Sequence, residues 1–74
     1  MTKYSDNPVG KFGRVTAQVG PGKKMGEVRI SIRGGTEDYM AVTSGDSAFD
    51  VNTIVIVTQL RSPRVVVVAE AWGM

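Results

Sequence analysis

The sequence of 74 residues contains no cysteine and no histidine. Without thiols it can form neither a disulfide framework nor a thiolate zinc site, and without imidazole it lacks the commonest proton-transfer group near neutral pH. Its apolar runs are far shorter than the roughly 18 residues that a membrane-spanning helix needs. The first ten residues are too polar for a signal peptide. We therefore expect these 74 residues to form a soluble domain that is stabilised by its core.

The chain also carries little net charge. Nine basic and seven acidic residues leave a net charge of +2 at neutral pH. A phosphate-binding surface needs positive side chains gathered on one face, so this mild balance indicates solubility rather than an electrostatic footprint. A length of 74 residues allows one small domain, close to the lower limit for a core that folds without disulfides or metals.

One stretch, residues 26–33, predicts a strand and both of its faces. Val28, Ile30 and Ile32 alternate with charged or hydroxyl side chains, and this period of two is typical of a half-buried β-strand. Four further short segments are alternating or β-branched, and turn residues separate them. The five predicted strands cover residues 13–19, 26–33, 37–43, 53–59 and 65–69.

The glycine pair Gly34-Gly35 leaves two registers open for the hairpin that follows residue 33. A two-residue turn would set Tyr39 opposite Ile30, whereas a three-residue turn would exchange the two faces of the next strand. We favour the two-residue turn, since glycine pairs suit it. That register turns Tyr39 and Ala41 inward, and Met40 and Val42 outward.

The strand pattern predicts an all-β fold, a small five-stranded OB-like β-barrel without the usual helix between the third and fourth strands. Closure of a sheet removes unpaired edges, and strands this short curl more easily than they form two packed sheets. The domain is expected to cover residues 9–71, after a flexible tail at residues 1–8 and before a terminus at residues 72–74. Predicted core residues are Val15, Ala17, Val28, Ile30, Ile32, Val55 and Val57.

The chain offers few groups for catalysis. Residues 20–24 resemble a fragment of a phosphate loop but lack the second glycine, the following hydroxyl residue and the helix, so we interpret them as a hairpin loop. The acidic residues of the pair Glu37-Asp38, and Asp46 and Asp50, lie in or beside turns without calcium-loop spacing. No histidine is present to activate a serine. We expect no enzyme activity, metal site, cofactor or small-molecule substrate.

The fourth and fifth predicted strands are apolar on both faces. A small barrel buries only one face of each strand, so the other face must meet something else. With little spare chain to cover that face, the pattern favours a protein interface. Candidate interface residues are Met40, Val42, Ile54, Ile56, Val66 and Val68. On the last strand, the surface would gather either Val66 or Val68 with its alternate neighbours.

A second hypothesis is a single-stranded nucleic-acid-binding OB-fold domain, because aromatic rings can stack on bases while arginines hold phosphates. Its face would use Arg29, Arg33 and Tyr39. Phe12, Trp72 and Arg14 supply two further rings and one further positive charge for such a face. The rings do not alternate with basic residues along one strand, and Tyr39 is expected to face inward. We therefore rank this hypothesis second.

Several segments resemble the C-terminal soluble domain of NfeD-like membrane proteins. They are residues 9–15 (VGKFGRV), 26–30 (GEVRI), 39–41 (YMA), 51–57 (VNTIVIV) and 64–68 (RVVVV), and the similarity covers about residues 9–70. Asn52 stands where glycine is usual, and Asn also enters left-handed conformations. Ile54 and Ile56 occupy positions that are usually polar.

The resemblance implies a non-enzymatic protein-interaction module in membrane organisation. The expected partner is a protein of the stomatin or flotillin type, or a second copy of the chain. The resemblance also implies transmembrane helices outside this sequence, so that the soluble domain is membrane-associated through its parent protein and lies on the cytoplasmic face. Longer members of the family add a serine protease domain, which is absent here.

Overall fold

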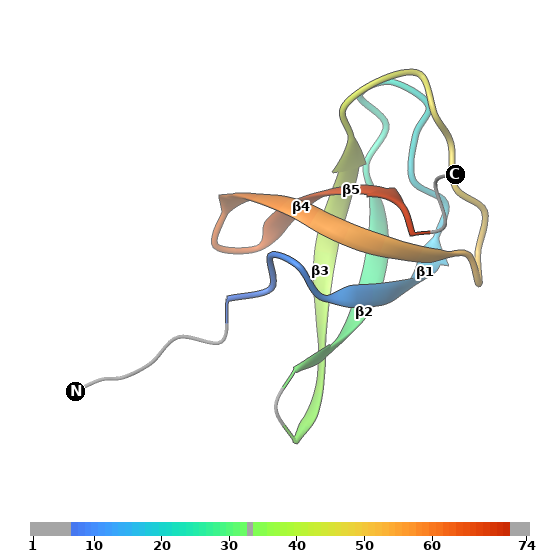
Figure 1. Ribbon diagram of the computed structural model, residues 1–74. Coiled ribbons are helices and arrows are strands. Elements are labelled where there is room, and N and C mark those ends of the chain that lie inside the picture. The colour runs from blue at the N-terminus through green and yellow to red at the C-terminus, as the bar shows by residue number, and fades with distance from the viewer. Residues whose placement is uncertain (1–6, 33, 72–74) are drawn as a thin grey trace.

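A computed structural model describes residues 7–32 and 34–71 of the chain, which form five strands (Figure 1). The strands are β1 (Phe12–Ala17), β2 (Gly26–Ile32), β3 (Gly35–Thr43), β4 (Ile54–Ser62) and β5 (Val65–Glu70). They close into a barrel in the order β1-β2-β3-β5-β4, in which only the β3–β5 pair is parallel. The described residues contain no helix. The predicted all-β barrel is confirmed.

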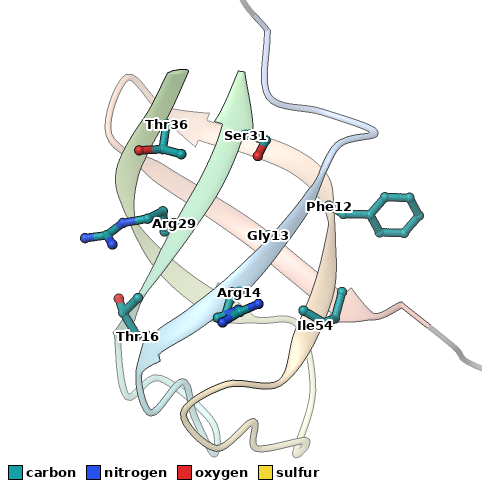
Figure 2. A pocket seen from close by; sticks show the side chains of 8 residues that line it. All are labelled: Phe12, Gly13, Arg14, Thr16, Arg29, Ser31, Thr36 and Ile54. Atoms are coloured by element: carbon teal, nitrogen blue, oxygen red, sulfur yellow. The ribbon is translucent and has the colours of Figure 1, made fainter. Parts of the chain in front are cut away.

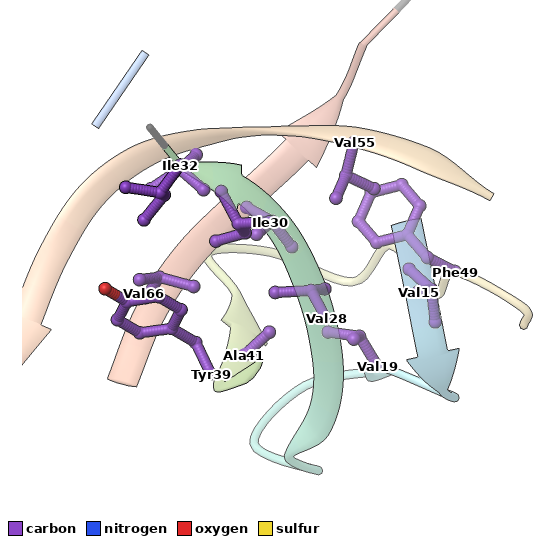
Figure 3. Packing of buried hydrophobic residues seen from close by; sticks show 12 residues of the cluster. Val15, Val19, Val28, Ile30, Ile32, Tyr39, Ala41, Phe49, Val55 and Val66 are labelled. Carbon is purple, nitrogen blue, oxygen red and sulfur yellow. The ribbon is translucent and has the colours of Figure 1, made fainter. Parts of the chain in front are cut away.

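The core is a cluster of inward side chains from all five strands (Figure 3). The predicted core residues Val15, Val28, Ile30, Ile32, Val55 and Val57 are buried and confirmed. Val19 and Phe49 join them from the connections between strands, where the two residues form an isolated bridge with N–O distances of 3.1 and 2.8 Å. Phe49 is a core residue that the sequence analysis missed, because its segment has no periodic pattern.

The prediction that Ala17 lies in the core is wrong, because Ala17 is exposed. Val15 pairs with Val28 on β2, but Ala17 pairs with the next residue, Glu27, so β1 carries one extra residue at this point. Such a β-bulge changes which face the following side chain occupies. Ala17 therefore shares the outward face of Glu27.

The β2–β3 hairpin turns one residue earlier than predicted. Ile32 pairs with Gly35, so Gly34 occupies the turn, with a φ of 79°, and Gly35 already belongs to β3. Tyr39 consequently lies opposite Val28 instead of Ile30. The pairing differs by two residues from the predicted one, so the faces do not exchange. Tyr39 and Ala41 point into the core as expected.

The connection between β3 and β4 closes against β1 through the backbone. The amide of Asn52 donates to the carbonyl of Val15 at 2.7 Å, and the amide of Val15 donates to the carbonyl of Thr53 at 2.9 Å. Asn52 has a φ of 79°, the left-handed conformation that asparagine tolerates better than most residues. This conformation agrees with the expectation for Asn at a position where glycine is usual.

The two ends of the chain fall mainly outside the described residues. Most of the predicted tail at residues 1–8 lies there, as do residues 72–74. Pro8 is described and buried, and its carbonyl accepts a hydrogen bond from the amide of Lys11 at 3.0 Å. A search of residues 7–32 and 34–71 for a helix long and apolar enough to cross a membrane found none.

Candidate interaction surface

An apolar row crosses three neighbouring strands on the outside of the barrel. Phe12 on β1 is in register with Ile56 on β4, and Ile56 is in register with Ala69 on β5. Ile54, the first residue of β4, is the outward position before Ile56. Phe12 is 52% exposed, and the other three are partly exposed. We call these four residues, Phe12, Ile54, Ile56 and Ala69, the outer strip.

The predicted placement of Val66 and Val68 on the surface is wrong. Both belong to the core, with exposed fractions of 0% and 1%. The outward positions of β5 are Val65, Val67 and Ala69 instead. A run of four valines shows no difference between its two faces, so only the pairing of β5 with its neighbours decides which of them point inward.

Val42 is also less accessible than predicted. It pairs with Val67 across the parallel β3–β5 contact, and the two are buried without belonging to the core cluster. Their side chains therefore occupy the outer face of the barrel but are covered there. Met40 remains exposed on the same strand, at 41%. Of the six predicted interface residues, Met40, Ile54 and Ile56 keep an accessible outward side chain.

A groove of about 340 Å³ lies beside the outer strip (Figure 2). It shares Phe12 and Ile54 with the strip, and its lining residues are Phe12, Gly13, Arg14, Thr16, Arg29, Ser31, Thr36 and Ile54. A side chain at Gly13 would point toward the core, where a Cβ would lie 3.0 Å from the Cγ1 of Ile30. Glycine thus lets β1 pack closely on β2 beneath the groove floor.

One cross-strand row fixes the charges of this groove. Arg14 is in register with Ile54 on one side and with Arg29 on the other, and Arg29 is in register with Asp38. The Nε of Arg29 donates to Oδ1 of Asp38 at 2.9 Å. This hydrogen bond lowers the pKa of Asp38 and raises the pKa of Arg29, since it stabilises both charged forms. From β4 to β3, the row therefore carries one apolar side chain, two positively charged ones and one negatively charged one.

The alternative nucleic-acid face is not assembled as predicted. Tyr39 is 7% exposed and packs in the core, as the favoured register predicted, so its ring offers no stacking surface for the alternative hypothesis. The guanidinium of Arg64 lies 5.0 Å from the centre of the Tyr39 ring, and its Nη2 donates to the carbonyl of Asp38 at 2.6 Å. Arg29 is exposed in the groove, whereas Arg33 lies outside the described residues, as does Trp72.

Two further features of the described chain bear on function. No group of three or more carboxylates that could hold a metal ion occurs among residues 7–32 and 34–71. A second hollow, of about 480 Å³, lies between the β1–β2 loop, the end of β3 and Arg61 of β4. Val42 contributes to its lining, together with Met25 and Asp46.

The closed five-stranded barrel and its helix-free β3–β4 connection define an OB-like domain, and comparison with known sequences identifies its family. Residues 12–69, more than half of the chain, match the NfeD C-terminal domain. The chain belongs to this family, as the sequence resemblance predicted. A search of curated proteins found no match.

A solved structure gives the same fold. It is the solution structure of the soluble domain of the NfeD protein YuaF from Bacillus subtilis, with 29% sequence identity and a TM-score of 0.76. The match covers 93% of this chain and 80% of the other. This chain is therefore similar to a soluble NfeD domain in both sequence and three-dimensional structure.

Proposed function

We propose that this chain is a non-enzymatic protein-interaction module of an NfeD-type membrane protein. In this proposal the parent protein holds the domain at the cytoplasmic face of a membrane. The partner is a stomatin- or flotillin-type protein or a second copy of the domain, and the association serves membrane organisation. Membership of the NfeD C-terminal domain family supports the membrane context.

The observation that carries the proposal is the outer strip. Its apolar side chains come from three adjacent strands, and Phe12, Ile56 and Ala69 share one cross-strand row. Full burial of an exposed Val, Ile or Phe side chain gains roughly 1.5 to 3 kcal/mol. Ile54 and Ile56 are already partly covered, so each would gain only part of that amount. A continuous strip still supplies a favourable term for association.

Replacing Ile54 and Ile56 together by Lys should weaken association while the barrel stays folded. Their strand neighbours Val55 and Val57 fill the core, so outward lysines need not enter it. Self-association would be measured by sedimentation, and partner binding by capture of a purified flotillin-type protein. Leu60→Lys is the matched control, because Leu60 lies on the same strand, is 40% exposed and is outside the outer strip.

Two results would count against the proposal. Unchanged association in the folded double variant would show that the outer strip is not the interface. If the double variant unfolds, Ala69→Lys provides a second test, since it adds a charge to the strip and removes no isoleucine. A folded Ala69→Lys protein with undiminished association would then exclude the strip.

A further inference from the structure

Two arginines stand directly opposite each other on the outside of the barrel. Arg14 of β1 is in register with Arg29 of β2, and both side chains are exposed in the groove. Like charges directly opposite each other destabilise an antiparallel pair. Neither side chain belongs to the core, so the fold gains no buried contact from the two charges. Only Asp38 on β3 offsets the two charges within this row, so one positive charge is left for a ligand.

The neighbouring strands neutralise only one of these two charges. Arg29 is turned toward β3, where its Nε binds Asp38 at 2.9 Å, and Figure 2 shows this side chain extending away from Arg14. The residue opposite Arg14 on its other side is the apolar Ile54. Within residues 7–32 and 34–71, the Arg14 side chain has no hydrogen-bond or ion-pair partner. Arg14 therefore presents an uncompensated positive charge at the edge of the outer strip.

The other lining residues specify the kind of anion that would fit. A guanidinium binds carboxylates through a planar fork of N–H donors. Ser31 and Thr36, which are in register on β2 and β3, bring two hydroxyl groups to the same groove. Ile54 adds an apolar wall next to Arg14. The groove thus combines a cation, hydroxyl donors and an aliphatic contact in one small space.

We infer that this groove binds an extended acidic segment of a protein partner. One carboxylate of the segment lies beside Arg14 and accepts hydrogen bonds from its guanidinium. A neighbouring apolar side chain packs on Ile54 and extends toward the outer strip. The inference rests on the proposed protein-interaction function and assigns a chemical class to the partner.

The groove suits a protein better than a single-stranded nucleic acid. Stacking platforms use several rings to hold successive bases, and of the eight lining residues only Phe12 is aromatic. Asp38 ends the charged row and would repel a phosphate chain that continued past Arg29. A peptide can place one carboxylate at Arg14 and neutral groups beside Asp38.

The test is an NMR titration of the isotope-labelled 74-residue chain with a defined peptide. The probe is an end-blocked peptide that alternates aspartate with leucine, and its control replaces aspartate by asparagine. We expect the acidic peptide to shift the backbone amides of Arg14, Arg29, Ser31 and Thr36. The asparagine peptide should bind at least about tenfold more weakly, which corresponds to about 1.4 kcal/mol.

A matched pair of charge reversals separates this site from a general charge effect. Arg14→Glu should weaken the aspartate peptide at least about tenfold, whereas Arg61→Glu should leave its affinity unchanged. Both variants change the net charge equally, and Arg61 lies in the second hollow. Equal losses in the two variants would overturn the inference, as would peptide-induced shifts confined to other strands. If Arg14→Glu does not fold, Arg14→Gln tests the same charge.

A third arm uses single-stranded oligothymidylate. Binding that is tighter than that of the peptide, falls steeply with salt and is lost in Arg14→Glu would assign the groove to nucleic acid and overturn the peptide assignment. If the acidic peptide does not bind but substitution of Ile54 and Ile56 still weakens protein association, the groove inference is wrong and the outer-strip interface stands. If the peptide binds as expected but that substitution has no effect, the outer-strip interface is wrong and the groove inference stands.

Discussion

Gly26 at the start of β2 leaves no room for even one added methyl group. A Cβ at this position would collide with the carbonyl oxygens of Ala17 and Gln18. These are backbone atoms at the β1 bulge, so no side-chain rotation can move them away. Gly26 is not among the residues with positive φ, and the conflict is therefore one of space rather than of backbone conformation.

We expect Gly26→Ala to lower the free energy of unfolding by about 3 kcal/mol. Insertion of an extra methyl group into a well-packed site typically costs about 1 to 3 kcal/mol, and the upper value applies where the backbone itself must shift. A small domain is stable by only about 5 to 15 kcal/mol in total. With a urea dependence of roughly 1 kcal/mol per molar for so small a chain, the unfolding midpoint should fall by about 3 M.

The assay is urea unfolding followed by far-ultraviolet circular dichroism, with Gly35→Ala as the matched control. A Cβ at Gly35 would meet no atom within 4 Å, and Gly35 does not have a positive φ. Alanine at this position should be neutral or stabilising by up to about 1 kcal/mol, because it reduces the entropy of the unfolded chain. If Gly26→Ala unfolds within about 0.5 M urea of the unsubstituted protein, the close approach at the bulge is refuted.

Two further predictions concern the core and the groove. Ile30→Ala should cost about 2 to 5 kcal/mol in the same urea assay, since Ile30 is fully buried, and a loss below about 1 kcal/mol would contradict its core position. Arg29→Gln should raise the pKa of Asp38 toward its ordinary value, because the hydrogen bond that lowers it is lost. A carboxyl group with a folded-state pKa below its unfolded value stabilises the protein above the unfolded pKa. That stability disappears as the pH falls below about 4, through the folded pKa. The free energy of unfolding of Arg29→Gln should therefore fall less than that of the unsubstituted protein as the pH is lowered. Identical NMR titrations of Asp38 in the two proteins would refute the ion pair.

Alternation along single strands was enough to predict much of this molecule. The faces of β2 follow from Val28, Ile30 and Ile32, because a period of two places every second side chain on one side of a pleated strand. Val55 and Val57 were also predicted to lie inside, although both faces of their strand are apolar, and the structure confirms their burial. The pattern also showed that Ile54 and Ile56 form a second apolar face, whereas a closed barrel buries only one face of each strand. The resemblance then indicated the NfeD family, which the comparison with known sequences confirmed.

The candidate groove could not be predicted from the sequence, because its charged residues come from different strands. Arg14, Arg29 and Asp38 belong to three strands, and only the register of those strands places them in one row. A shift by one residue would have turned one strand's side chains to the other face. The opposed arginines thus become evident only when the barrel is paired.

Local patterns in the chain were enough to predict the class of fold, one face of each clearly alternating strand, and the excess of apolar side chains on the last two strands. Strand pairing in the barrel placed Val66 and Val68 in the core, covered Val42 and, through a bulge, turned Ala17 outward. All three outcomes have one cause. Alternation divides a strand into two faces through local backbone geometry, but which face is buried depends on hydrogen-bonded partners distant in the chain.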